Sequence, residues 1–225
     1  MSDARDDSIQ FIDVGQRPVP MIDFVPVPMN FDAPPSDPVT EFRRWLDEAH
    51  RLALFNPNAM ALATVDADGT PSLRTVLLKG FDEQGALFFT NRMSRKGRAL
   101  ESHPHAALSF HWDNLARQVH IIGRVSQTSD AISDAYFLTR PRESRIGAWS
   151  SDQSQPVASR EKLDARVAQT EARFAGKEVP RPPHWGGYRV ALDSIEFWQG
   201  DLFRVHDRIV YQRLEGGWKI ARLFP

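Results

Sequence analysis

The chain of 225 residues contains no cysteine. This absence excludes disulfide bonds, a thiolate nucleophile, and zinc or iron–sulfur centres held by cysteine. No apolar run is long enough to cross a bilayer, and the N-terminus shows no basic stretch followed by an apolar core, as a signal peptide would. We therefore expect a cytoplasmic protein without a membrane partner.

An excess of either charge sign is also missing. Lys and Arg number 28 against 29 Asp and Glu, which gives a formal net charge of −1 and argues against a general nucleic-acid binder. There is no Gly-x-Gly-x-x-Gly, no Walker-type loop and no Gly-x-Ser-x-Gly, so Rossmann, P-loop and hydrolase sites have no support. The histidines form no metal-ligand pattern with nearby carboxylates, and we predict no metal site.

Proline is concentrated at the beginning of the chain. Seven of the 16 prolines lie in residues 1–38, where no helical or strand period is visible. We expect residues 1–36 to form an extended, partly disordered arm. Residues 37–225 are then one domain with a real hydrophobic core.

Short β-like runs dominate that domain. Asp37 and Pro38 are a good helix start, and Asp68-Gly69 indicates a hairpin. Further helices are predicted at 94–102, 129–138 and 157–174. Strands are predicted at 60–65, 72–78, 87–90, 106–112, 118–125, 188–192, 195–198, 203–211 and 218–223. This order predicts a mostly β fold with α decoration, built as a β-barrel.

The segment Arg204-Val205-His206-Asp207-Arg208 carries the most information about function. In an extended strand, Arg204, His206 and Arg208 would share one face. A row of basic groups is sensible if an anionic or electron-rich ligand lies across it. A solvated edge strand that uses basic residues against aggregation explains the pattern equally well.

Two further stretches offer cations to a ligand. Arg74 and Lys79 lie at the rims of a strand through residues 74–79, as ligand contacts or as surface charges. Ser94 is a plausible helix cap, and Arg95 and Lys96 follow in the first turn, where positive charge opposes the helix dipole. Because those cations lie at the wrong end for stability, a phosphate site is favoured over a solvated basic turn.

Tyr136, Arg140 and Ser144 recur every four residues. Pro141 must end the helix near Thr139, so Tyr136 and Arg140 share a face and Ser144 lies beyond the break. The three groups suit a phosphate, although an ordinary helix end with a cationic cap is the simpler interpretation of the spacing alone. Gln118, Gln153 and Ser154 could bind the polar edge of a heterocycle or be ordinary surface groups, and Trp185 and Trp198 fit a core at least as well as a stacking role.

Taken in order, these segments resemble the pyridoxine/pyridoxamine 5′-phosphate oxidase family. The resemblance covers roughly residues 37–225. The matching stretches are Arg-Thr-Val-Leu-Leu-Lys (74–79), Phe-Phe-Thr-Asn (88–91), Ser-Arg-Lys-Gly-Arg (94–98), Arg-Gln-Val (117–119), Tyr-Phe-x-x-Arg-Pro-Arg-x-Ser-x-Ile-Gly-Ala-Trp (136–149), Gln-Ser (153–154), Trp-Gly-Gly-Tyr-Arg (185–189), Glu-Phe-Trp-Gln-Gly (196–200), Arg-x-His-Asp-Arg (204–208) and a closing Trp-Lys-Ile-x-Arg-Leu-x-Pro.

The resemblance implies an FMN-binding split β-barrel that works as a homodimer with two flavins at the subunit interface. Carried over by position, the FMN contacts would be Arg74, Thr75, Val76, Leu77, Leu78, Lys79, Phe89, Thr90, Arg95, Lys96, Gln118, Gln153, Ser154, Trp198 and Arg208. Lys79, Tyr136, Arg140 and Ser144 would hold the substrate phosphate. Arg204 and His206 would be the catalytic pair, with Arg204 nearest the reacting carbon and His206 orienting the pyridine ring.

The activity implied is oxidation of pyridoxine 5′-phosphate and pyridoxamine 5′-phosphate to pyridoxal 5′-phosphate. Hydride passes to flavin N5, and dioxygen reoxidises the flavin and leaves as hydrogen peroxide. Family members carry an N-terminal Arg-x-x-Tyr element that closes over the substrate, and residues 17–32 have no match to it. Two alternatives stay open: a related FMN oxidase of a dihydrophenazine-type precursor, and a non-catalytic flavin-binding split-barrel protein.

Overall fold

Antiparallel strands form most of the domain, and a computed structural model describes residues 27–52 and 55–225. The strands are β1 (Ala59–Val65), β2 (Pro71–Leu77), β3 (Gly80–Asp82), β4 (Gly85–Asn91), β5 (His105–Trp112), β6 (Arg117–Gln127), β7 (Trp185–Val190), β8 (Ser194–Gln199), β9 (Asp207–Leu214) and β10 (Gly217–Arg222). The helices are α1 (Pro38–Arg51), α2 (Arg95–Ser102), α3 (Asp130–Thr139), α4 (Arg142–Ser150) and α5 (Arg160–Arg173), with 3₁₀ turns η1 (Asp113–Leu115) and η2 (Leu202–Arg204). The expectation of a mostly β fold with α decoration is therefore confirmed.

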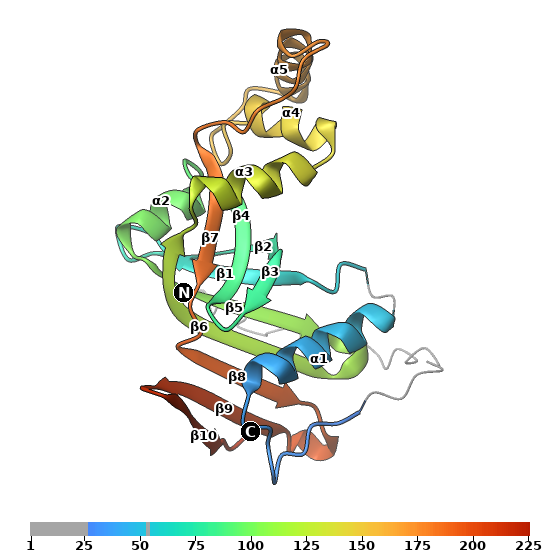
Figure 1. Cartoon of the computed structure of the whole chain (residues 1–225), viewed down its shortest axis with the longest axis vertical. Coiled ribbons are helices and arrows are strands. Elements are labelled where there is room, and N and C mark those ends of the chain that lie inside the picture. Colours follow the sequence, from blue (N-terminus) through green and yellow to red (C-terminus); the bar gives the residue numbers. More distant parts are fainter. Residues whose placement is uncertain (1–26, 53–54) are drawn as a thin grey trace, which may run out of the picture.

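The long strand β6 joins two parts of the sheet. One path of the sheet runs β10-β9-β8-β6-β5-β1-β2, and β7 and β4 branch from the far end of β6. Gly123 lies where β6 leaves β8 and turns to β7, and a Cβ there would overlap the carbonyl oxygen of Ala191. The close approach requires glycine at this position. Figure 1 shows the result, with α3, α4 and α5 at one end of the molecule and β8, β9 and β10 at the other.

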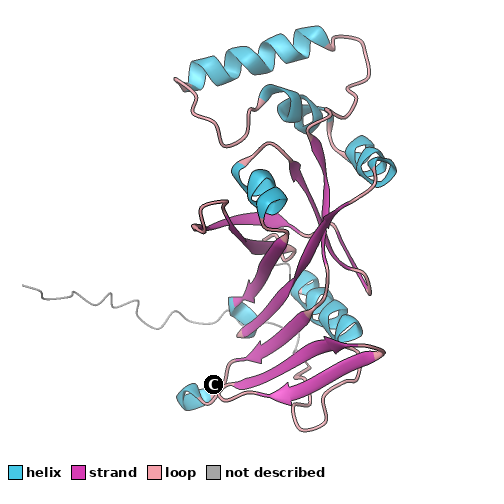
Figure 2. Ribbon diagram, turned by 90° about the vertical axis from the view of Figure 1, so that its left-hand side faces the viewer, coloured by secondary structure: helices cyan, strands magenta, loops and turns pink. Residues whose placement is uncertain are grey.

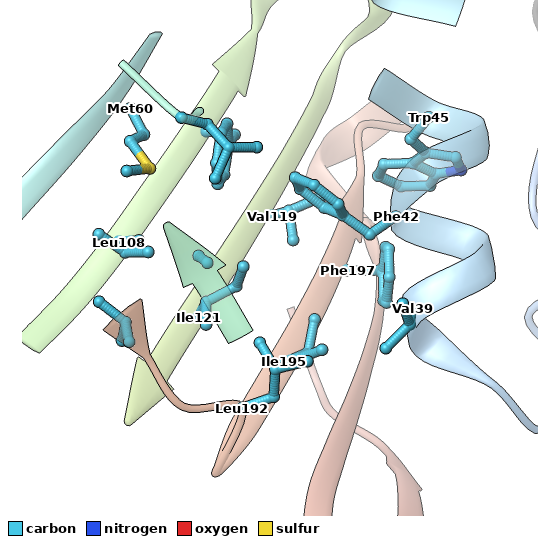
Figure 3. Packing of buried hydrophobic residues seen from close by; sticks show 14 of the residues in the cluster. Val39, Phe42, Trp45, Met60, Leu108, Val119, Ile121, Leu192, Ile195 and Phe197 are labelled. Atoms are coloured by element: carbon cyan, nitrogen blue, oxygen red, sulfur yellow. The ribbon is translucent and has the colours of Figure 1, made fainter. Parts of the chain in front are cut away.

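Helix α1 covers the main core. Asp37 caps it through the Val39 and Thr40 backbone N–H groups, and Pro38 occupies the first turn, as the sequence predicts. Phe42 and Trp45 on its inner face are completely buried, and the Trp45 ring lies 5.2 Å from that of Phe197 on β8 (Figure 3). Each such ring contributes roughly 1.5–3 kcal/mol through burial, so α1 is held by packing.

A buried ion network ties α1 to the barrel. Arg117, at the start of β6, is 1% exposed, pairs with Glu48 and stacks on Trp45 at 4.4 Å. Arg44 bonds Glu48 as well, at 2.6 Å. Both guanidinium groups also donate to the backbone carbonyl of Val27, at 2.7 and 2.8 Å. The network therefore joins three segments that are distant in sequence.

The predicted arm is described only in part, because residues 1–26 lie outside the described residues. Residues 27–36 contain no helix or strand. Met29 and Phe31 are buried in the main core, at 5% and 8% exposure. The absent Arg-x-x-Tyr element falls on residues 17–32, most of which are likewise outside the described part of the chain.

The predicted strand 203–211 is wrong at its beginning. Leu202–Arg204 forms the 3₁₀ turn η2, and β9 begins only at Asp207. Phe203 and Arg204 have φ values of 57° and 63°, since the chain must reverse tightly between β8 and β9. Arg204 and His206 therefore precede the strand, and the alternation that placed both on one face with Arg208 does not exist.

Helix α4 was not predicted from the sequence. Pro141 ends α3 at Thr139 as expected, but it also serves as the N-cap residue of α4, a place where proline is tolerated. Ser144 therefore lies on a second helix. Elsewhere the predicted elements are present with shifted ends, and β7 begins at Trp185 instead of residue 188. None of the helices in residues 27–52 and 55–225 has the length and apolarity needed to cross a membrane.

Candidate functional site

A cavity of about 830 Å³ lies between the edge of the sheet and the helical end of the molecule. Strands β2, β4 and β7, the first turn of α2, the end of α3 and α4 supply its walls. Figure 2 shows the helices at this end of the molecule in a view turned by 90°. The structure brings together most of the sequence-predicted site residues here: Arg74, Thr75, Val76, Leu77, Lys79, Phe89, Thr90, Lys96, Tyr136, Arg140, Ser144 and Gln153. Arg95 and Ser154 line a smaller adjoining hollow of about 310 Å³, together with Arg74 and Lys96. Leu78 instead belongs to the hydrophobic core, at 5% exposure.

The charge lining this cavity is of one sign. Arg74, Lys79, Lys96 and Arg140 face it, and none of its described lining residues is acidic. Cations that are gathered without carboxylates repel one another, and an anionic ligand would remove that repulsion. The arrangement suits ligands that carry phosphate.

Lys96 is the most deeply buried of these cations, at 9% exposure. Ser94 caps α2 by accepting the Gly97 N–H, which fixes the first turn as predicted. The Lys96 Nζ then reaches Gln153 Oε1 at 2.7 Å and Thr90 Oγ1 at 3.3 Å. Burial, with a smaller contribution from Arg74, lowers the pKa of Lys96 to about 8. Its neighbour Arg95 is exposed, lines the smaller hollow and pairs with Asp66 at 2.6 Å.

Arg74 is held in place by neutral oxygens. Its guanidinium donates to Thr64 Oγ1 and Ser72 Oγ, both at 2.6 Å, and to the Leu62 carbonyl at 3.1 Å. These contacts orient the group without neutralising it. Burial lowers the pKa of Arg74, which is the cost of keeping a cation there without a counter-ion.

The break at Pro141 gathers the third set of groups. Tyr136 comes from the last turn of α3, Arg140 follows that turn directly, and Ser144 comes from the first turn of α4. The Lys79 Nζ approaches from the short link between β2 and β3 and lies 5.8 Å from the centre of the Tyr136 ring. Arg140 lies over the rings of Trp185 and Phe137, and its Nη1 is buried without a hydrogen-bond partner among the described residues.

The remaining predicted residues form a second group at the other end of the sheet. Gln118, Trp198 and Arg208 stand directly opposite one another on β6, β8 and β9. The His206 ring lies 4.6 Å from Trp198, and its Nδ1 accepts the Asp201 backbone N–H at 3.1 Å. Arg208 is already paired with Glu196 at 2.8 Å, and Arg204 is exposed.

The two groups do not meet within one chain. β8 is four strand steps from β2 along the sheet, which corresponds to roughly 19 Å at the usual strand spacing. The cavity also has lining residues that were not predicted from the sequence: Asn91, Thr139, Pro141, Gly147, Ala148, Ser151 and Trp185. Trp185 could have been found from the sequence, because it begins the matching stretch Trp-Gly-Gly-Tyr-Arg (185–189). It was not chosen because a buried tryptophan is usual in a hydrophobic core. The described residues hold no cluster of three or more potential metal-ligating side chains.

Two family models match the chain. The first is described as pyridoxamine 5′-phosphate oxidase and covers residues 46–174. The second is described as pyridoxine 5′-phosphate oxidase C-terminal dimerisation region and covers residues 185–225. The second match includes Trp198, Arg204, His206 and Arg208, the C-terminal members of the group that the cavity leaves out.

Curated relatives match over most of their length. A pyridoxine/pyridoxamine 5′-phosphate oxidase from Rubrobacter xylanophilus is 55% identical over 194 residues, which is 86% of this chain and 89% of the relative. A second oxidase of the same name, from Cupriavidus necator, is 55% identical over 190 residues, or 84% of this chain and 89% of the relative.

Solved structures share the fold. PhzG from Burkholderia lata 383, determined in complex with tetrahydrophenazine-1-carboxylic acid, superposes with a TM-score of 0.83 at 34% identity and covers 89% of this chain and 99% of its own. A pyridoxamine 5′-phosphate oxidase-related, FMN-binding protein from Nostoc punctiforme has a TM-score of 0.67 at 16% identity, covering 84% of this chain and 98% of its own. The split β-barrel predicted from the sequence is confirmed.

Proposed function

Since the chain belongs to the pyridoxine/pyridoxamine 5′-phosphate oxidase family, we propose that it oxidises pyridoxine 5′-phosphate and pyridoxamine 5′-phosphate to pyridoxal 5′-phosphate. The proposed enzyme is a cytoplasmic homodimer that uses FMN and dioxygen. The observation that carries the proposal is the cavity with four cations and no described acidic lining residue. Both the cofactor and the substrate bring a phosphate to such a cavity, so it needs more positive charge than one anion would.

The residues present fit FMN. Lys96, Arg74 and the adjoining Arg95 and Ser154 form a continuous polar wall with Gln153 and Thr90, and we assign the cofactor to this wall. Phe89 and the β2 residues 75–77 supply apolar and backbone surface beside it. When bound, FMN supplies the acceptor for a hydride from the substrate carbon and passes the electrons to dioxygen.

We assign the substrate phosphate to Lys79, Tyr136, Arg140 and Ser144. A guanidinium with a free donor, an ammonium and two hydroxyls offer several charge-assisted hydrogen bonds to one phosphate. Arg204 and His206 of the partner subunit would complete the site over the pyridine ring. Because Nδ1 of His206 already accepts a backbone N–H, a neutral ring carries its proton on Nε2 and can donate it to an oxygen of the substrate.

An oxidase assay tests the proposal. The FMN-loaded protein should release peroxide with pyridoxine 5′-phosphate and pyridoxamine 5′-phosphate. With unphosphorylated pyridoxine, kcat/KM should be lower by about a hundredfold or more, because the phosphate-binding cations are then left unpaired. A protein that binds FMN yet forms no peroxide from either phosphate ester would contradict the proposed activity.

One other substrate class has a specific observation behind it, the similarity to PhzG. Tetrahydrophenazine-1-carboxylic acid therefore belongs in the same assay. Lys79, Tyr136, Arg140 and Ser144 are all present around the cavity, and a phenazine ring without a phosphate would give this set no partner. We expect turnover of the phosphate esters to exceed that of the phenazine compound.

The affinity for FMN should fall as the pH rises. A pKa of about 8 leaves Lys96 mostly protonated at pH 7 and mostly neutral at pH 9. FMN phosphate binds the ammonium form, so its Kd should increase about tenfold between pH 7 and pH 9. Titrations that follow the quenching of flavin fluorescence measure this change.

The matched variant for that titration is Lys96→Met, which keeps the unbranched stem as far as Cε and removes the ammonium group. It should bind FMN more weakly at pH 7 and show little change up to pH 9. The same tenfold change in Lys96→Met would assign the titration to another group.

A further inference from the structure

Arg140 has an unusual environment for a half-buried cation. Its guanidinium makes no ion pair or side-chain hydrogen bond with any residue in the described part of the chain, and Nη1 is completely enclosed. The group lies instead over two aromatic rings, with its central carbon 4.8 Å from the centre of Trp185 and 5.3 Å from that of Phe137. Aromatic faces attract the plane of a guanidinium and leave its N–H groups unused.

Trp185 is itself fixed from several sides. It is 6% exposed, and its ring is nearly parallel to Phe89 at 5.3 Å and 8° and meets Phe137 edge-on at 5.0 Å and 71°. The Trp185 carbonyl oxygen accepts a hydrogen bond from Arg181 Nη1 at 2.7 Å, and Trp185 lies opposite Asn91 where β7 pairs with β4. The indole is therefore a rigid plane at the wall of the cavity.

We propose that Trp185 is a positioning residue that sets the plane of the Arg140 guanidinium, so that the group keeps its donors unpaired for the phosphate of a substrate in the cavity that it lines. The inference rests on the proposed function and adds a specificity-determining residue to it. A carboxylate in the place of Trp185 would also orient Arg140, but it would occupy the donors and cancel the charge. The indole orients the guanidinium and leaves both its donors and its charge available.

The loop geometry makes such support necessary. Arg140 follows the last turn of α3 in an extended conformation and precedes Pro141, so the helix does not direct its side chain. Without the Trp185 face, the guanidinium is free to turn into the open part of the cavity. Preorganisation of this kind lowers the entropy lost when the phosphate binds.

Binding of an unreactive pair of analogues tests the inference without turnover. The probes are 4-deoxypyridoxine 5′-phosphate and 4-deoxypyridoxine, titrated into the FMN-loaded protein by calorimetry, and the measured quantity is the ratio of their Kd values. In Trp185→Leu this preference for the phosphorylated form should fall about tenfold. Binding of the unphosphorylated form should stay unchanged. Trp185→Phe, which keeps an aromatic face, should retain most of the preference.

A second variant keeps the test independent of the folding of Trp185→Leu. Arg140→Lys conserves the charge but cannot stack as a plane, and it too should lose about tenfold of the preference. The double variant should lose no more than either single one, because both remove the same interaction. Trp218→Leu is the matched control: Arg213 lies 4.2 Å over that ring, away from the cavity, and the preference should not change.

Several results would overturn the inference. They are an unchanged preference in Trp185→Leu, an equal weakening of both analogues, additive losses in the double variant, or no preference in the wild-type protein. Failure of the proposed function has a different signature. A wild-type protein that prefers the phosphorylated analogue but forms no peroxide contradicts the oxidase and leaves Trp185 open to the same measurement.

Discussion

Two inactive variants should regain activity when their subunits are combined in one dimer. The first variant, Lys79→Ala with Arg140→Ala, removes cations from the cavity. The second, Arg204→Ala with His206→Ala, removes the pair that lies beyond β8. In a mixed dimer with two-fold symmetry, one site keeps both groups intact and the other site loses both, so about half of the wild-type activity per dimer should return.

The reason is the separation of the two groups within a chain. The cavity is lined from β2, β4 and the helical end, whereas Arg204 and His206 follow β8 at the opposite end of the sheet. The match to a C-terminal dimerisation region spans residues 185–225 and includes that pair. A substrate held by both groups must therefore lie between two subunits.

Co-expression with two different affinity tags isolates the mixed dimer for a peroxide assay with pyridoxine 5′-phosphate. Each variant as a homodimer is the control and should show only background activity with FMN retained. A mixed dimer as inactive as its parents would place all the catalytic groups of a site within one subunit.

Removal of the Glu48 carboxylate should destabilise the protein more than any other single change discussed above. Arg117 is 1% exposed, and Glu48, 6% exposed, is its acidic partner. Glu48→Ala leaves a buried guanidinium without a counter-ion, which costs about 3–5 kcal/mol of the free energy of unfolding. The melting temperature should fall by roughly 10 °C for a chain of this size.

Thermal unfolding of the FMN-loaded protein at a fixed concentration measures the effect. The matched control is Asp164→Ala, which breaks the Arg160–Asp164 pair on the surface of α5, where the side chains are 79% and 55% exposed. That change should cost no more than about 1 kcal/mol. A loss in Glu48→Ala no larger than in the control would show that the Arg117 charge is compensated elsewhere.

Local patterns were the part of the fold that the sequence predicted best. The cap at Asp37, the cap at Ser94 and the hairpin at Asp68-Gly69 each depend on side chains within four residues, and all three are present. The prediction of where β9 begins was wrong because alternation presumes an extended backbone. The chain instead reverses at Phe203 and Arg204 in left-handed conformations, and neither residue is a glycine that would indicate such a turn. Helix α4 was missed in the sequence because Pro141 both ends one helix and begins the next.

The candidate site divides in the same way. Sequence patterns identified Lys96 and the set around Pro141, since the residues of each set are close together in the sequence. They could not show that Gln118, Trp198 and Arg208 form a row on the far side of the sheet, because that row depends on strand order. Trp185 was missed for a different reason. It belongs to a stack of aromatic rings and also lines the cavity, and the sequence does not distinguish a tryptophan with both roles from one that lies only in the core.

The contact at Val27 has a consequence for how variation in this segment should be interpreted. Arg44 and Arg117 both donate to its backbone carbonyl, and its side chain is exposed. Any residue at position 27 supplies that oxygen, so substitutions there would be tolerated and the position would look unimportant in a mutational scan. A deletion that shortened the segment would withdraw the oxygen from both guanidinium groups at once. What position 27 contributes to the fold is the path of the backbone, which a survey of side chains alone does not detect.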